Sequence, residues 1–491
     1  MNHSINRKLN RQLFFWISVI LLLLPFVQIS FPPSTDLPQH LCQIHLLSEI
    51  IQGKTALYEI HWYPPNTLVY FILAIVGRLF PPPLSGKIVL MILVLAWIGS
   101  FYLLAYYRNR PVENAMFAGL LIFNISFYWG FLSFLVGWPF FIFWLILSLQ
   151  PMNKKNLTCM FIISIFLYWA HVLWFLVSSA WLLLYNIYRF KNFKSFIYNL
   201  LPVIPIGIIT LIWRSSFLLA YQRTGIDLKP YWSNSPFERL NPYFFINTLT
   251  GIKGLFEIII VFAIFAWIMI SLYSNWKSLK KKTDIPLIIG ALFFLFISFF
   301  APLKYLNTIF FAQRWFPCAI ILLILGLPSP GMNKKLIRAV SIILLIFYST
   351  ITSATWVMFE RTELSGLKRS LNMIPENQRV LGLDFIKTSN FIKWRPFVQT
   401  FAYSQAIKGG ELNFSFAEQP SGIVQYKERR KTQWTRGLKW FPEMIQDKDL
   451  EYFDYILINT KEENHLLFAA TPNLKSVTFQ GRWRLYKIIH E

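Results

Sequence analysis

The sequence predicts a polytopic α-helical membrane protein that ends in a small α/β domain outside the membrane. Three observations carry this prediction. Of the 491 residues, 55% are hydrophobic and only 14% are charged, a balance that is rare in soluble globular proteins. Apolar stretches of nearly twenty residues recur, with short loops rich in Lys and Arg between them. The composition then changes at Met358, because 15 of the 23 acids lie beyond that point and no later apolar run is long enough to cross a bilayer.

About eleven transmembrane helices are expected. The first, Leu13 to Ser30, is longer than a typical signal-peptide core and lacks a small-residue cleavage site, so we expect it to stay uncleaved. Six Lys/Arg clusters separate the spans, and assigning them all to the cytoplasm leaves the N-terminus inside and the tail outside. The predicted spans lie near residues 13–30, 85–107, 113–129, 131–150, 157–170, 171–188, 197–214, 256–274, 285–302, 309–327 and 336–357.

Two segments test this scheme. Residues 67–80 form an apolar stretch that, at ~1.5 Å per residue, covers about two-thirds of a ~30 Å hydrocarbon core. We therefore predict a surface or re-entrant helix there; a true span is the alternative, and it would place Arg108 and Arg110 outside. Residues 157–188 are too long for one span, and a break at "YWAHV" fits the charge pattern.

The domain organisation follows from the same scheme. A transmembrane domain over 1–357 would carry a first outer loop at 31–84 and a second at 215–255, followed by an extracytoplasmic α/β domain over 358–491. In that tail, residues 379–385 and 452–460 are predicted to be buried strands, "FVQTFAYSQAIKGG" a helix stopped by glycine, and "SVTFQGRWRLYKII" an edge hairpin or strand pair.

The net charge of +24 does not indicate a nucleic-acid partner, because most cations outside the tail lie in short clusters between spans. The three cysteines fit neither a disulfide framework nor a zinc motif. The GxGxxG and GxxxxGK phosphate loops are also absent, which disfavours a cytosolic nucleotide-sugar enzyme.

The stretch "PPSTDLPQHLCQIHLLSEI" directly follows the first apolar segment. Thr35 or Asp36 is placed to cap a helix with Pro38 in its first turn, and Asp36, His40 and Gln43 would share one polar side. One interpretation is an N-cap aspartate with solvated neighbours. Another is a catalytic base at the membrane surface, where a carboxylate deprotonates an acceptor hydroxyl while a lipid-bound donor reacts. A divalent metal held by Asp36 and His40 is a third, weakened by the absence of a third ligand.

This stretch and several others resemble one known protein family. "TDLPQHL", "YPPNTLVYFILAIVGRLF", "FYWGFLSFLVGWPFFIFWLIL", "YWAHVLWFL", "AQRWFPCAIILLILG" and the tail's "KGGELNFSFAEQ" followed by Tyr426 together resemble the GT-C superfamily of integral-membrane glycosyltransferases, in its bacterial form. The resemblance spans nearly the whole chain. It implies a polyprenyl-phosphate-linked sugar donor and Asp36 as general base. His40, with His171 as a second candidate, would orient that base or the acceptor.

If the resemblance holds, the leaving group is an anionic polyprenyl phosphate, which requires cations at the outer surface. The candidates for phosphate contact are Arg314, Lys304, Arg214 and Arg223; for each, interfacial snorkelling is the alternative. Residues proposed to line the substrate cavity are His171, His61, Glu59, Tyr231 and Trp232, although aromatic side chains are common at membrane interfaces.

The predicted function is inverting transfer of a hexosyl or pentosyl group to a glycan, lipid or protein acceptor on the outer face of a bacterial inner membrane. Its expected partners are the polyprenyl-phosphate sugar, that acceptor and membrane lipid, with no nucleic acid and no cofactor beyond the metal alternative. The competing hypotheses are a flippase or transporter of lipid-linked oligosaccharide and a polymerase of the O-antigen type. A transporter should place polar residues at the bilayer midplane, whereas the acids here gather in the predicted outer loops.

Overall fold

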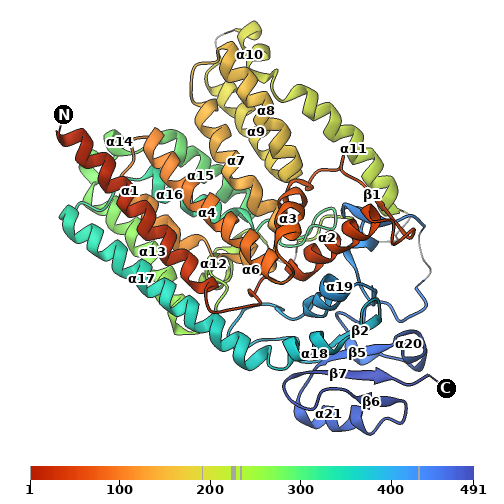
Figure 1. Cartoon of the computed structure of the whole chain (residues 1–491). Helices are drawn as coiled ribbons and strands as arrows, with labels where there is room; N and C mark the ends of the chain where they lie inside the picture. Colours follow the sequence, from red (N-terminus) through yellow and green to blue (C-terminus); the bar gives the residue numbers. More distant parts are fainter. Residues whose placement is uncertain (1, 191, 223–227, 233–234, 429–431, 491) are drawn as a thin grey trace. The chain divides into compact units, whose positions relative to one another are not determined.

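The computed structural model describes residues 2–190, 192–222, 228–232, 235–428 and 432–490. It divides into two compact units. The first comprises Met1–Val27, Met91–Phe127 and Leu132–Ser353, and the second comprises Gln28–Leu90, Tyr128–Phe131 and Ala354–Glu491. Figure 1 labels most of the helices and strands of both units.

The first unit is entirely helical in its named elements. Its apolar helices have hydrophobic residues on all sides, as expected for segments that contact lipid or other helices around their whole circumference. Two of them, α4 and α17, continue into the second unit. The helices are α1 (Asn2–Leu23), α4 (Leu84–Tyr107), α5 (Val112–Ala118), α7 (Leu132–Ser148), α8 (Lys154–Ala170), α9 (Val172–Tyr188), α10 (Phe193–Leu200), α11 (Ile204–Gln222), α12 (Pro242–Leu249), α13 (Leu255–Ser274), α14 (Leu279–Lys282), α15 (Ile285–Phe300), α16 (Trp315–Gly326) and α17 (Lys334–Met358).

Four helices in the described residues are long and apolar enough to cross a membrane, namely α4, α11, α13 and the run Lys334–Glu363. A fifth is added if residues 276–282 and 285–300, bent by 97° at their junction, count as one span. The chain is thus a helical membrane protein, as expected, but the count of eleven crossings is not confirmed.

One predicted span is broken into short pieces. Residues 113–129 form α5, a 3₁₀ turn at Gly119–Leu121 and α6 (Ile125–Trp129) in place of one helix. The Asn124 amide explains the break, because its Nδ2 donates to the Leu121 carbonyl at 2.8 Å and its Oδ1 accepts from the Ser126 amide at 2.9 Å. A short polar side chain that bonds its own backbone in this way competes with helix propagation. Likewise, the span expected over 309–327 is helical only from Trp315.

The break predicted at "YWAHV" is confirmed. Helix α8 ends at Ala170 and α9 begins at Val172, with His171 in extended conformation between them. The ambiguous apolar stretch is α3 (Leu68–Leu79), whose twelve residues span only ~18 Å at ~1.5 Å per residue. Its placement at the membrane surface stays a prediction.

The second unit contains a five-stranded sheet in the order β3-β2-β5-β7-β6. Strand β2 (Arg379–Asp384) runs parallel to β3 (Glu411–Leu412) and β5 (Tyr455–Asn459), and β7 (Trp483–Ile488) is antiparallel to both β5 and β6 (Leu474–Ser476). The predicted strands and the C-terminal strand pair are confirmed, although only β6 of that pair lies at an edge. Helices α20 (Asp447–Tyr452) and α21 (Glu462–Ala469) accompany the sheet, whose core includes Leu381, Leu383, Ile456, Ile458 and Tyr486.

The predicted first outer loop packs with the tail in this same unit. Helix α2 (Leu37–Ile51) contacts α19 (Tyr403–Lys408), which Gly409 ends at a positive φ of 73° (Figure 1). Strand β1 (Tyr58–Ile60) pairs antiparallel with β4 (Val424–Tyr426), more than 360 positions away. The contacts therefore join residues 28–90 to the tail, and the sequence-based division at 357/358 stays a prediction. The tail also contains helix α18 (Leu367–Met373).

Candidate functional site

Asp36 lies at the start of α2, held by its backbone. Its amide donates to the Trp129 carbonyl at 3.0 Å, and the Thr35 amide donates to the Tyr128 carbonyl at 2.8 Å. Asp36 occupies the N-cap position, with Pro38 in the first turn, but its side chain makes no capping hydrogen bond to that turn. The N-cap interpretation thus holds for the backbone position and not for the carboxylate.

Gly130 allows this close approach of two distant segments. Its φ is +76°, and a Cβ there would lie 2.9 Å from both the Asp36 amide nitrogen and Ser34 Oγ. Only glycine adopts this conformation without cost and leaves room for the neighbouring backbone. The residue after Trp129 therefore helps to set the position of Asp36.

His40 is buried one turn along α2, with both ring nitrogens engaged. Nε2 lies 3.2 Å from the Gly130 carbonyl and Nδ1 lies 2.9 Å from the Tyr70 hydroxyl. A carbonyl only accepts, so Nε2 carries the proton and Nδ1 accepts from Tyr70. Burial lowers the His40 pKa to about 4, which keeps the ring neutral. His40 is consequently suited to positioning rather than proton transfer.

These contacts bear on the metal alternative. His40 would have to give up one of its hydrogen bonds to ligate an ion beside Asp36. The described residues contain no group of three or more His, Cys, Asp and Glu side chains able to hold a metal.

The polar side of α2 faces the tail. Gln39 Nε2 donates to Gln399 Oε1 at 3.0 Å and to the Phe414 carbonyl at 3.1 Å, while Gln39 Oε1 accepts from the Phe416 amide at 3.0 Å. Gln43 makes a similar pair of bonds to the backbone of Val424, at 2.9 and 3.1 Å. Of the predicted polar side, Gln43 thus hydrogen-bonds the tail, and Gln39, which was not assigned to that side, does so as well.

The tail also contributes a cation that sequence analysis missed. Lys439 Nζ lies 2.8 Å from the centroid of the Phe414 ring, within electrostatic reach of Asp36 and Glu418. Burial lowers the Lys439 pKa to about 7, against the opposing effect of the two carboxylates. No motif marks this lysine; only the docking of Phe414 onto Gln39 brings it toward Asp36.

Glu59 and His61 form a local pair at β1. Their side chains lie 2.9 Å apart, and the His61 amide donates to the Ile423 carbonyl at 2.7 Å. Nearby, the rings of Tyr58 and Tyr426 pack with centroids 4.6 Å apart. The unit that holds Asp36 also holds this pair.

The other predicted residues lie in the first unit. Arg314 and His171 are both buried and share one neighbour, since the Arg314 guanidinium lies 5.8 Å from the Phe134 ring and the His171 ring packs edge-on against Phe134 at 5.8 Å. Arg314 Nη2 donates to the Ile309 carbonyl at 2.8 Å, and His171 Nδ1 accepts from the Leu173 amide at 3.2 Å. The first unit therefore brings this cation and the histidine at the helix break to the same aromatic ring.

The second-loop candidates have mixed outcomes. The Tyr231 amide donates to the Lys304 carbonyl at 2.9 Å, and Trp232 Nε1 donates to the Phe300 carbonyl at 3.4 Å. Arg214 was predicted at a helix end, and this is wrong, because α11 continues to Gln222 and Arg214 is exposed within it. Arg223 lies outside the described residues.

Arg239 is a buried cation that the sequence did not single out. Its Nη1 donates to the carbonyls of Ser298 and Ala301, at 3.2 and 2.6 Å, around the end of α15. Within the described part of the chain, its Nε and Nη2 have no hydrogen-bond partner. Burial lowers the Arg239 pKa. Buried guanidinium N–H groups of this kind are suited to an anionic ligand.

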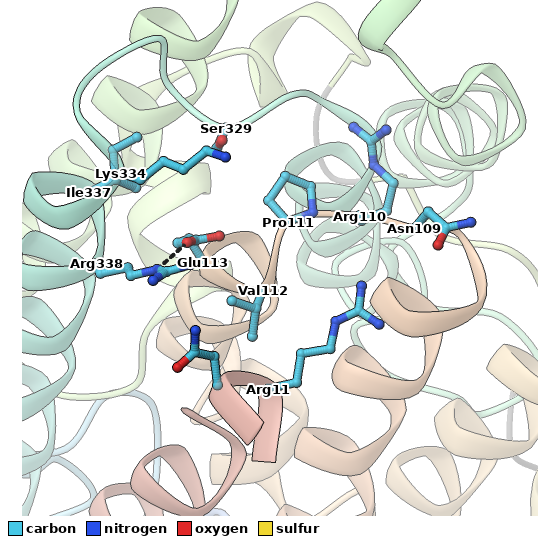
Figure 2. Close-up of a pocket in the computed structure, with 11 residues that line it drawn as sticks. Arg11, Asn109, Arg110, Pro111, Val112, Glu113, Ser329, Lys334, Ile337 and Arg338 are labelled. Atoms are coloured by element: carbon cyan, nitrogen blue, oxygen red, sulfur yellow. Dashed lines mark hydrogen bonds and ion pairs between the residues drawn. The ribbon is translucent and has the colours of Figure 1, made fainter. Parts of the chain in front are cut away.

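A basic pocket of about 180 Å³ in the same unit has a structural explanation (Figure 2). Arg110 donates to the carbonyls of Leu325, Gly326 and Leu327 at the end of α16, and Arg338 pairs with Glu113 at 2.7 Å. Cations at a helix C-terminus complement its dipole. Arg110 belongs to a cluster that the sequence assigns to the cytoplasm.

No protein-family profile matches the sequence, and no curated protein matches it either. Two solved structures do: ArnT from Cupriavidus metallidurans bound to undecaprenyl phosphate, and the same protein in the apo state. Both have a TM-score of 0.54, at 11% and 10% identity, over 96% of this chain and 97% of theirs.

This chain has the fold of ArnT. The expected resemblance is confirmed for the fold, along nearly the whole chain. This fold and the apolar helices together support an integral-membrane protein.

Proposed function

We propose that this chain is a glycosyltransferase that transfers a sugar from a polyprenyl-phosphate donor to a glycan, lipid or protein acceptor. The fold it shares with ArnT, one structure of which is bound to undecaprenyl phosphate, supports a lipid-linked donor. One observation supports Asp36 as the base: its backbone is held by the segment 128–130, while its side chain does not cap α2.

In the proposed reaction Asp36 is the general base. Its carboxylate takes the acceptor hydroxyl proton as the acceptor oxygen forms a bond to the anomeric carbon of the donor sugar. The bond from that carbon to the phosphate oxygen breaks, and polyprenyl phosphate leaves as an anion. Attack opposite the leaving group inverts the anomeric configuration. His40, fixed by Tyr70 and Gly130, positions the start of α2.

We assign the leaving phosphate to cations of the first unit. Arg314 and Arg239 are buried, and Lys304 pairs through its backbone with Tyr231. Arg214 and Arg223 complete the predicted set, and His171, His61, Glu59, Tyr231 and Trp232 are the proposed contacts of sugar or acceptor. Positive groups placed before the reaction stabilise charge that develops on the leaving oxygen.

The proposed location is a bacterial inner membrane, with the N-terminus in the cytoplasm and the tail in the periplasm. This orientation follows from the Lys/Arg clusters. A flippase or polymerase is the alternative function, but no described contact favours either.

The test is replacement of Asp36 by Asn. Asparagine has nearly the same shape as aspartate, and the Asp36 side chain makes no capping hydrogen bond to α2, so the helix should keep its stability while the base is lost. We expect sugar transfer to fall by roughly 10²–10⁴-fold. The matched control is Glu49→Gln on the same helix, which removes a carboxylate that pairs with His45 at 3.5 Å.

The readout is mass spectrometry of lipids and glycans from a deletion strain that carries each variant. The glycan lost on deletion should return with Glu49→Gln and not with Asp36→Asn. Equal amounts and thermal stability of the two purified proteins would exclude misfolding as the cause. Restoration of the glycan by Asp36→Asn would contradict the proposed role of this carboxylate.

A further inference from the structure

A groove in the second unit has the composition of a lipid-headgroup site. It consists of two adjoining cavities of about 660 and 280 Å³, which share Phe31, Lys368 and Asn372 in their linings. The first cavity is also lined by Arg361 and Arg369, and the second by Lys87. We call this feature the basic groove.

Two candidate membrane spans end at the basic groove. The span Lys334–Glu363 finishes just before Leu364 in the first cavity, and α4 begins at Leu84 in the second. The C-terminal end of the span Lys334–Glu363 and the N-terminal end of α4 both line the groove. These two helix ends should therefore lie on the same side of the membrane. We therefore expect the groove to lie at headgroup depth.

Three cations of the groove are available to a ligand. Arg361, Lys368 and Arg369 are exposed, and none of their side chains forms an ion pair or hydrogen bond with another described residue. Glu360 is the one acid among the described lining residues, and its Oε2 accepts from the amides of Ser30 and Phe31 at 2.7 and 2.9 Å. The Glu360 carboxylate thus hydrogen-bonds backbone amides and does not pair with an arginine or lysine of the groove.

Most of the remaining wall is apolar, with Ser30 and Asn372 as its polar members. Phe31 and Leu364 are buried, Met373 is 45% exposed, and Leu84 lies where α4 begins. Positive groups beside an apolar wall at headgroup depth match an anionic headgroup with a hydrocarbon chain. A cluster of cations on this side also runs against the positive-inside tendency that the other clusters follow, so orientation alone does not explain it.

We propose that the basic groove binds the phosphate headgroup of a membrane lipid, with the hydrocarbon chain along Phe31, Leu364 and Met373. Lys368 and Arg369 contact the phosphate, and Arg361 and Lys87 border it. Lys87 Nζ donates to the Ile29 carbonyl at 2.9 Å and so also fixes the chain that leads to Asp36. The shared chemistry is a phosphate ester on a lipid, either a phospholipid or a polyprenyl phosphate.

The test is lipid titration of the purified, delipidated full-length chain, followed by native mass spectrometry. The probes are phosphatidylglycerol, phosphatidylcholine with the same acyl chains, undecaprenyl phosphate and inorganic phosphate. The variant is K368Q/R369Q. The control is K475Q/K487Q, which removes two exposed lysines at paired positions of β6 and β7 and so matches the change in charge.

We expect the wild type to prefer phosphatidylglycerol to phosphatidylcholine. K368Q/R369Q should bind phosphatidylglycerol roughly 30-fold more weakly, while the control is unchanged. If the affinity lost in K368Q/R369Q is greater for undecaprenyl phosphate, the proposal holds with a polyprenyl lipid as the source. Unchanged binding in K368Q/R369Q, or binding of inorganic phosphate as tight as that of phosphatidylglycerol, would overturn it.

This inference is separable from the proposed function. Asp36→Asn should leave phosphatidylglycerol binding intact, because Asp36 does not line the groove. Loss of transfer with lipid binding kept, or the converse, tells which of the two proposals fails.

Discussion

Replacing Gly130 with alanine tests whether residues 128–130 position Asp36. Two costs apply at this site. The first is conformational, because a φ of +76° disfavours any residue with a Cβ, at about 1–2 kcal/mol. The second is steric, because the new Cβ would lie 2.9 Å from the Asp36 amide nitrogen and 3.1 Å from that of Leu37.

The steric cost falls on backbone, which cannot rotate away as a side chain would. Overpacking of this kind costs about 1–3 kcal/mol, so the total is about 2–5 kcal/mol. Relief requires the start of α2 to move away from segment 128–130. A catalytic group displaced by ~1 Å loses on the order of 10²-fold in rate, so we expect both stability and sugar transfer to fall.

Gly53→Ala is the matched control. Gly53 has a similar φ of +68°, and a Cβ added there would have nothing within 4 Å, so this change carries only the conformational cost. Thermal unfolding of both purified variants and complementation of the deletion strain give the comparison. Equal stability and equal transfer for Gly130→Ala and Gly53→Ala would refute the idea that contact with Asp36 decides the outcome.

Two further predictions concern charge and topology. Burial lowers the Lys439 pKa to about 7, below its value in the unfolded chain, so the folded state loses this proton at a lower pH than the unfolded state. The unfolding temperature of wild type relative to Lys439→Met should therefore rise as the pH increases from 7 to 10. A difference in unfolding temperature that does not change with pH would contradict this prediction. In a variant with Cys159 replaced by serine, a cysteine at the exposed position Gln52 should react with an impermeant thiol reagent from outside, and one at exposed Lys155 should not; the reverse pattern would contradict the orientation.

Local signals predicted much of the secondary structure. The strands β2 and β5, the glycine stop after α19 and the break at His171 all follow from residues next to one another in the chain. The same kind of reasoning was wrong for 113–129, because hydrophobicity there is continuous while the Asn124 side chain interrupts the helix. The length of an apolar segment indicates whether the segment can lie in an apolar environment. It does not reveal a single side-chain hydrogen bond that interrupts the helix.

By itself the sequence determined that this chain enters a membrane, that its tail contains both strands and helices, and that Asp36 follows the first apolar segment at the start of a helix. These properties depend on composition and short-range spacing, which hydrophobic burial and backbone geometry translate directly into structure. Only the tertiary structure decided what surrounds Asp36. Gly130 lies close to the Asp36 backbone, Tyr70 hydrogen-bonds His40, and Lys439 comes from the tail. The tertiary structure alone also joined residues 30–31, 84–87 and 361–373 into one groove. Such contacts join positions up to about 400 residues apart, and their free energy depends on packing in the folded chain, to which no local pattern corresponds.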